Sequence, residues 1–275
     1  MEYPKNILQA TVLLIFGFIA LLPLIAINEL HIINIPKEIF NHIIFLLYFL
    51  AIAFFYDWKN KGTVSFTSFF KASYSFNVIA YLIICLIVMI FQVGINVPIS
   101  KFISYHLSEK NNIINPLSDI YTVLGAIILA PFCEEIIFRG IILRGFLSKY
   151  KFKVAILLSA IIFCIFHISP PQIFGALTLG LFFGYLYGYT KNLVTTIIFH
   201  ALSNLTSILI GLLLFQNLSA GRTNMIYGQW TTLTIGMSII LVACLIYLLH
   251  TIIKRNCINN VIYNSKNNTS QILDC

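Results

Sequence analysis

Long apolar runs, separated by short polar stretches, follow one another along the whole chain. A helix needs about 20 residues to cross a hydrocarbon layer of ~30 Å, and eight runs approach that length. Their continuous apolarity predicts helices, because the strands of a membrane barrel alternate polar and apolar positions. The predicted spans are Ile7–Ile27, Ile39–Tyr56, Phe76–Pro98, Ile120–Gly145, Val154–Ile168, Ile173–Tyr189, Leu193–Phe215 and Thr231–Ile253. The pattern therefore predicts an all-α polytopic membrane bundle of about eight transmembrane helices.

The composition agrees with a chain whose main solvent is lipid. Hydrophobic residues make up 59% of it and charged residues only 9%, which is far more apolar than a water-soluble core requires. No connection between the spans is long enough to hold a soluble domain. We therefore expect a single transmembrane domain over residues 1–255, followed by a polar cytoplasmic tail over residues 256–275.

The net charge of +8 does not predict a nucleic-acid partner, because the basic residues form no single patch. The basic residues are instead concentrated in the connections on one side of the predicted membrane. With eight spans both termini share one side, and that side collects Lys5, Lys59, Lys61, Lys71, Arg144, Lys149, Lys151, Lys153, Lys191, Lys254, Arg255 and Lys266. The other side keeps only Lys37, Lys101, Lys110 and Arg222. By the positive-inside rule both termini are expected to be cytoplasmic, and the Ile-, Asn- and Lys-rich composition favours a bacterial cytoplasmic membrane.

Two adjacent carboxylates lie well within a predicted span, although the other carboxylates of the chain fall in loops, at span ends or in the tail. They are Glu134 and Glu135, and Arg139 follows at a spacing of i, i+4 from the second. A charged side chain at the centre of a membrane helix costs about 2.5–3.5 kcal/mol on insertion scales, so such residues are usually functional. A structural ion pair between Glu135 and Arg139 explains one glutamate. It leaves Glu134 unpaired.

Two other spans supply polar groups at compatible depths. His167 is about as far after the turn at Tyr150–Lys151 as Glu134 is before it, which places both roughly 24 Å from that turn at ~1.5 Å per residue. His200 and Asn204 share one helix face, and His200 lies ~14 Å in from the same surface. Lone polar residues of this kind often bond neighbouring membrane helices. Polar groups from three spans at one depth instead favour a buried site.

This set of residues contains what amide hydrolysis needs. Glu134 is a candidate general base, Glu135 paired to Arg139 would hold its helix in place, and His200 with Asn204 are candidates to donate to the oxyanion. The residues show no serine or cysteine coupled to a base, so a covalent nucleophile is disfavoured. Two histidines and a glutamate are also a known catalytic zinc set, so a divalent metal stays open. Six cysteines without paired spacing predict neither a disulfide framework nor a cysteine-ligated metal.

These residues resemble the CAAX-protease and bacteriocin-processing intramembrane proteases, also called the abortive-infection family. The family pattern is E-E-x-x-x-R, F-x-x-x-H and H-x-x-x-N on successive spans. Here the motifs read E-E-I-I-F-R at Glu134–Arg139, F-C-I-F-H at Phe163–His167 and H-A-L-S-N at His200–Asn204. Each motif alone is weak, whereas all three in order are strong. The resemblance covers Ala130 to about Ser207, and the family-like core is expected over about residues 120–215.

The resemblance implies an intramembrane endopeptidase in which Glu134 and His167 activate water, and His200 and Asn204 bind the oxyanion. Glu135 and Arg139 would support the site. The expected substrate is a membrane-associated protein or peptide in the lipid bilayer, and the oligomeric state is not predicted. Family members are described both as metal-dependent and as glutamate-driven. They act in bacteriocin self-protection and peptide-signal processing as well as in prenyl-protein maturation.

Two other function classes fit a buried Glu, His and Arg. A proton-coupled transporter also uses such residues, but it needs them spread along a path, whereas these cluster at one depth. A non-catalytic immunity or regulatory scaffold would bind another membrane protein without hydrolysing it. A complete motif set argues against the scaffold but leaves it open.

Overall fold

The computed structural model describes residues 3–29, 37–62, 66–70, 76–106, 119–167, 169–219 and 230–266. Every predicted span falls at least partly within these ranges and is helical there except at its ends, where Phe76, Asn77 and His167 lie outside the helices. The predicted tail is described only as far as Lys266, and the predicted basic loop residues Lys71, Lys110 and Arg222 lie outside the described residues.

The helical segments form eight rods in the described part of the chain. Their bounds are α1 (Ile7–Glu29), α2 (Lys37–Lys59), η1 (Phe66–Phe70), α3 (Val78–Phe91), η2 (Gln92–Asn96), α4 (Val97–His106), α5 (Ile120–Leu124), η3 (Gly125–Leu129), α6 (Ala130–Glu135), η4 (Ile136–Leu143), α7 (Arg144–Leu147), α8 (Phe152–Phe166), α9 (Pro170–Thr190), α10 (Leu193–Ser219) and α11 (Thr231–Lys266). The short η1 is a 3₁₀ turn. The segments η2, η3 and η4 are π-helical, so α3 to α4 form one rod and α5 to α7 another.

Six of these helices are long and apolar enough to cross a membrane. They correspond to the first three and the last three predicted spans. The remaining two predicted spans are the α5–α7 rod, which π-helical turns interrupt, and α8, which has 15 residues. The prediction of an all-α polytopic bundle is confirmed. The chain is a multi-pass integral membrane protein.

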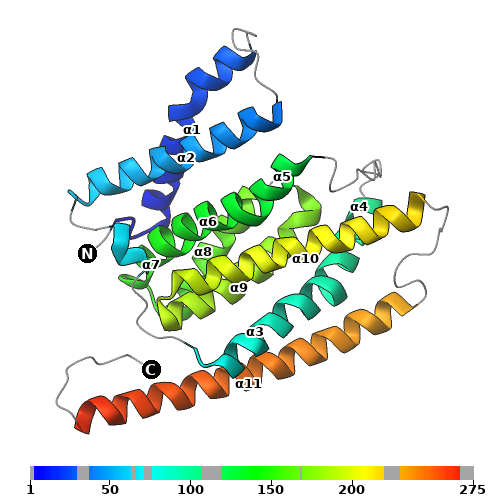
Figure 1. Ribbon diagram of the computed structural model, residues 1–275. Helices are drawn as coiled ribbons and strands as arrows, with labels where there is room; N and C mark the ends of the chain where they lie inside the picture. Colours follow the sequence, from blue (N-terminus) through cyan, green and yellow to red (C-terminus); the bar gives the residue numbers. More distant parts are fainter. Residues whose placement is uncertain are drawn as a thin grey trace.

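The α5–α7 rod lies between α2 on one side and α8, α9 and α10 on the other (Figure 1). The α1–α2 hairpin lies along one edge of the bundle and α11 along the opposite edge. Between them, α8 packs against α9, and α10 packs against α6 and α3. All eight residues of η4 are buried, which makes this π-helical segment the centre of the core. The start of α1 and the end of α11 lie at the same end of the bundle, and their cytoplasmic orientation stays a prediction.

Local sequence explains where several helices begin and end. The side chain of Asn77 caps α3 by accepting a hydrogen bond from the Ala80 amide at 2.9 Å. Pro170 opens α9, where its missing N–H costs nothing, and the residue before a proline avoids helical backbone. Accordingly α8 ends at Phe166, and His167 has φ −92° and ψ 79°. The expected fifth span extended to Ile168, so the structure places His167 just beyond the helix rather than inside it.

Candidate active site

The buried ion pair lies on the α5–α7 rod. Nη1 of Arg139 donates to Oε1 of Glu135 at 2.8 Å, and the two side chains are 1% and 0% exposed. The guanidinium also lies 4.5 Å from the centre of the Phe163 ring, a cation–π contact of the kind that stabilises desolvated arginines. The pair expected from the i, i+4 spacing is therefore present. The pair is shielded from bulk solvent, so each charge must be compensated mainly by the other.

The same carboxylate of Glu135 connects the ion pair to α10. Nδ1 of His200 lies 2.8 Å from Oε1 of Glu135. A carboxylate that is paired with Arg139 is an acceptor only, so Nδ1 of His200 carries the proton of this hydrogen bond. That arrangement turns Nε2 of His200 away from Glu135. The sequence predicted a supporting role for Glu135 but not this direct bond to a histidine on another helix.

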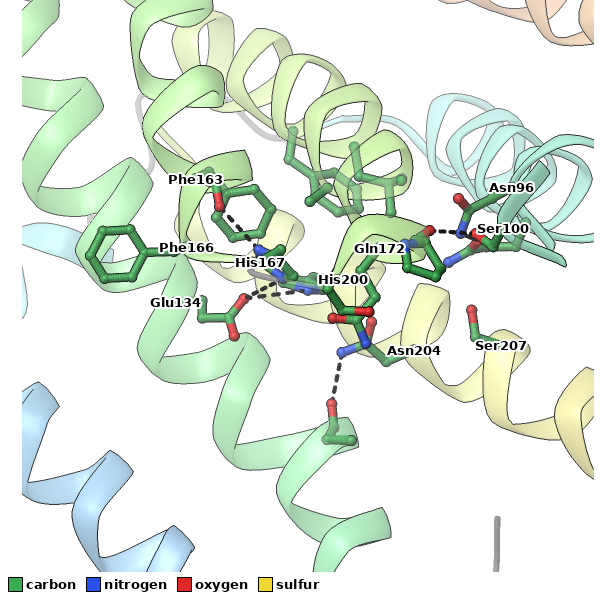
Figure 2. A pocket seen from close by; sticks show the side chains of 18 of the residues that line it. Asn96, Ser100, Glu134, Phe163, Phe166, His167, Gln172, His200, Asn204 and Ser207 are labelled. Carbon is green, nitrogen blue, oxygen red and sulfur yellow. Dashed lines mark hydrogen bonds and ion pairs between the residues drawn. The ribbon is translucent and has the colours of Figure 1, made fainter. Parts of the chain in front are cut away.

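Glu134 faces two histidines from two other segments of the chain. Its Oε2 atom lies 4.0 Å from Nε2 of His167 and 3.9 Å from Nε2 of His200. These distances exceed a hydrogen bond, and Oε2 is buried with no hydrogen-bond partner among the described residues. Figure 2 shows the three side chains turned toward one another. The matching depth expected for Glu134 and His167 thus corresponds to a real proximity.

The protonation of His167 follows from its other contact. Nδ1 of His167 lies 3.0 Å from the carbonyl oxygen of Phe163, which is the first residue of the same F-x-x-x-H motif. A carbonyl only accepts hydrogen bonds, so Nδ1 carries the proton and Nε2 of the neutral ring is an acceptor. Nε2 therefore presents a lone pair on the side of Glu134. The Phe163 ring packs edge-on against the same imidazole, with ring centres 4.6 Å apart.

Asn204 lies one helical turn after His200 on α10. Its Nδ2 atom donates to the carbonyl oxygen of Ala126 at 2.8 Å, and Ala126 belongs to the π-helical turn η3. Turns of this type occur often at functional sites. One of the two amide protons is used by this bond, so the second proton and the oxygen are left for other partners. The bond also ties α10 to the α5–α7 rod beside the two glutamates.

The glutamate and the histidines line a cavity of about 750 Å³. Its walls come from α2, the α3–α4 rod, the α5–α7 rod, α8, α9 and α10. Many of the lining side chains are aromatic: Phe45, Tyr48, Phe138, Phe163, Phe166 and Phe183. Of the residues predicted for the site, Glu134, His167, His200 and Asn204 line the cavity. Glu135 and Arg139 lie behind it, which fits the expected difference in their roles.

The described residues do not form a ready-made metal site. No group of three His, Cys, Asp or Glu side chains among them converges closely enough to hold a metal ion. Glu134, His167 and His200 face one another, and their contacts of about 4 Å exceed by only about half an ångström the separation of roughly 3.4 Å between donor atoms that bind one tetrahedral zinc ion at 2.0–2.2 Å. The divalent metal therefore stays a prediction, with Glu134, His167 and His200 as the side chains that would hold it.

A second polar group in the cavity was missed by the sequence analysis. Gln92, Asn96 and Ser100 follow one another at i, i+4 and i+8 on the α3–α4 rod, and all three line the cavity. Nε2 of Gln92 donates to the carbonyl oxygen of Ser203 at 3.2 Å and to its hydroxyl at 2.5 Å. The helical spacing of three polar residues in an apolar span was the signal that would have found them. Ser203 anchors this group to α10.

Residues 116–206 match the model of the family described as type II CAAX prenyl endopeptidase Rce1-like. All three motifs fall within that range, which is about a third of the chain. The chain is also 34% identical over 82 residues to the protein named "Putative membrane peptidase YdiL" of Bacillus subtilis (strain 168), and the match covers 30% of this chain and 34% of the relative. The chain thus spans about a third of the length of the curated relative that it matches.

No solved structure matches the chain. The likeness therefore rests on the two sequence matches, and the family match over residues 116–206 includes Glu134, His167, His200 and Asn204 of the cavity. These matches agree with the family that the three motifs predicted. Residues 116–206 therefore resemble the Rce1-like type of CAAX prenyl endopeptidase, the same family likeness that the three motifs predicted.

Proposed function

We propose that the protein is an intramembrane endopeptidase that hydrolyses a peptide bond of a membrane-associated protein or peptide. The observation that carries the proposal is the approach of two imidazole Nε2 atoms to one buried carboxylate oxygen of Glu134, at 3.9 and 4.0 Å, in a cavity of about 750 Å³. A gap of that size between an acceptor and two ring nitrogens suits a water molecule that bonds to all of them. The sequence match to a peptidase family supports the same reaction.

Glu134 and His167 are proposed to activate the water. Both present an acceptor toward the gap, since Oε2 of Glu134 has no hydrogen-bond partner among the described residues and Nδ1 of His167 is occupied by the Phe163 carbonyl. The Glu134 carboxylate takes one proton from the water molecule while the oxygen of the water attacks the peptide carbonyl carbon. The same proton then passes to the leaving amine.

His200 and Asn204 are proposed to stabilise the oxyanion. In its doubly protonated form His200 donates from Nδ1 to Glu135 and has a proton on Nε2 for the developing negative charge. Asn204 has one amide proton beyond the one bound by Ala126. Glu135 and Arg139 position His200 rather than touching the substrate. Donors held in this way need no reorganisation during the reaction, which is the basis of oxyanion stabilisation.

The experiment compares cleavage of a quenched peptide library by the purified protein in lipid nanodiscs, for wild type and Glu134→Gln. We expect Glu134→Gln to slow cleavage by at least ~100-fold, since a general base contributes about 10²–10⁴-fold. The matched control is Asp119→Asn, which makes the same change from carboxylate to amide at a helix cap outside the cavity, where Asn caps nearly as well as Asp. Equal cleavage by wild type and Glu134→Gln would refute the proposal and favour a scaffold or a transporter.

The predicted divalent metal is tested in the same assay by adding a chelator. The steps proposed above use only side chains, so they predict that cleavage survives chelation. A loss of cleavage that zinc restores would mean that the side chains of Glu134, His167 and His200 close around a metal. Activation of the water by that metal would then replace the activation by Glu134 and His167 proposed here.

A further inference from the structure

The polar group on the α3–α4 rod ends in an acceptor that no described residue satisfies. Nε2 of Gln92 must donate, because the carbonyl oxygen of Ser203 only accepts. Oε1 of Gln92 therefore accepts the bond of 2.6 Å from Nδ2 of Asn96. The direction of these two hydrogen bonds fixes the orientation of both side-chain amides. Oδ1 of Asn96 is then the acceptor at the end of the chain of hydrogen bonds. Oδ1 is buried and has no hydrogen-bond partner in the part of the chain that the structure describes.

The environment of Asn96 holds this acceptor in place. A Cβ atom added to Gly175 on α9 would lie 2.5 Å from Oδ1 of Asn96, so the α9 backbone approaches the amide as closely as glycine allows. Gln92 is only 2% exposed and fastens the amide from the other side. A buried acceptor that is left without a donor destabilises the folded state. A fixed acceptor of this kind is therefore expected to have a donor in the working protein.

The position of Asn96 in the cavity indicates what the donor is. Asn96, Gln172 and Ser207 line the same cavity as Glu134 and His167, and Figure 2 places Asn96 across the pocket from Glu134. The hydroxyl of Ser100 already donates to the carbonyl oxygen of Pro171 at 2.7 Å, so it does not supply the proton. A substrate peptide that crosses the cavity brings main-chain N–H groups, each of which must be bonded once water is excluded.

We propose that Asn96 is a positioning residue for the substrate, whose Oδ1 atom accepts a main-chain N–H of an extended peptide while Gln92 holds the amide in place. This inference rests on the proposed function and deepens it. It assigns the cavity a main-chain contact remote from the scissile bond. Binding energy from such a remote contact fixes the scissile bond beside the catalytic groups.

The test measures binding rather than cleavage, so it is separate from the test of the catalytic groups. A fluorescein-labelled, Leu- and Ala-rich peptide with blocked ends is bound to Glu134→Gln protein in nanodiscs and followed by anisotropy. It is compared with a series of esters in which one backbone N–H at a time is replaced by oxygen. At one position the ester is expected to bind about five- to tenfold more weakly, the effect of one hydrogen bond of about 1–1.4 kcal/mol.

The same series is bound to Glu134→Gln protein that also carries Asn96→Leu, which keeps the size of the side chain and removes the acceptor. The ester effect at that position is expected to disappear, so that ester and parent peptide bind within about twofold. Gly175→Ala is the second variant, because its Cβ displaces Oδ1 without removing it, and it is expected to reduce the ester effect. Leu86→Ala, on the exposed face of the same rod, is the control and should leave the effect unchanged.

Coupling between one ester position and Asn96 would support the proposal, because a merely structural role of Asn96 would weaken all peptides alike. An ester effect of equal size with and without Asn96 would overturn it, and so would the absence of any ester effect or of any peptide binding. A water that satisfies Oδ1 gives no coupling and counts among these negative results. Each negative result leaves the cleavage test of Glu134 standing on its own.

Discussion

Arg139→Met is expected to destabilise the fold by about 3–5 kcal/mol, the usual cost of leaving one partner of a buried ion pair uncompensated. Arg139 is 1% exposed and Glu135 is 0% exposed, so water cannot replace the lost guanidinium. The substitution also removes the cation–π contact with Phe163, which lies 4.5 Å from the guanidinium carbon. Methionine fills most of the vacated space, so the cost comes mainly from the charge left behind.

The charge of Glu135 can be removed as well as that of Arg139, and the two changes can then be combined. Glu135→Gln alone leaves Arg139 as an unpaired buried cation and is also expected to be destabilising. In the double variant both charges are gone, and the glutamine oxygen still accepts from Nδ1 of His200. A neutral, packed replacement for a buried pair is often tolerated. We therefore expect the double variant to be at least ~2 kcal/mol more stable than the sum of the two single effects would give.

The free energy of unfolding of the four proteins is measured in mixed detergent micelles under reversible conditions. Leu186→Met is the control for methionine in a fully buried position, and a volume-conserving change of this kind should cost less than about 1.5 kcal/mol. Effects of the two single substitutions that simply add within about 0.5 kcal/mol would refute the coupling. A cost below about 1 kcal/mol for Arg139→Met would refute the account of the buried charge.

Two further predictions concern the packing and the charge at the ends of the helices. Gly145→Ala is expected to lower the free energy of unfolding by about 1–3 kcal/mol, because a Cβ there would lie 2.0 Å from the backbone oxygen of Pro4. Gly236→Ala is the control, since a Cβ at Gly236 meets nothing within 4 Å. A thermal unfolding temperature that is no lower for Gly145→Ala than for Gly236→Ala would contradict this prediction. Burial, and secondly the nearby Arg144, lower the pKa of Lys191 from its ordinary 10.5 to about 8. Since the folded value is the lower one, stability should rise with pH between these two values, and persistence of the full rise in Lys191→Met would show that another group causes it.

Features of the site that depend on local spacing along the chain could be predicted from the sequence. Glu135 and Arg139 are one helical turn apart, so their ion pair follows from the helix itself. Glu134 and His167 are equally far from one turn, so their similar depth follows from two antiparallel segments. Neither pair depends on how the other helices pack, and the structure brings Glu135 close to Arg139 and Glu134 close to His167.

Features that depend on the packing of distant segments were not predicted. The bond between His200 and Glu135 requires a particular rotation of α10 against the α5–α7 rod, which spacing along the chain does not specify. The same is true of Gln92 and Ser203, which are 111 residues apart. The π-helical turn that contains Ala126 has no local signature in an apolar run. The end of α8 before His167 was predictable in principle from Pro170, although the apolar pattern continued past it.

The measurement that tests the central claim most directly is the rate of a single turnover by wild type and Glu134→Gln in nanodiscs, with excess enzyme over the best-cleaved peptide of the library. A single turnover isolates the chemical step from binding and product release. The account predicts that the rate falls at least ~100-fold in Glu134→Gln, while Asp119→Asn keeps the wild-type rate. A single-turnover rate for Glu134→Gln within a few-fold of wild type would contradict the assignment of Glu134 as the residue that activates water.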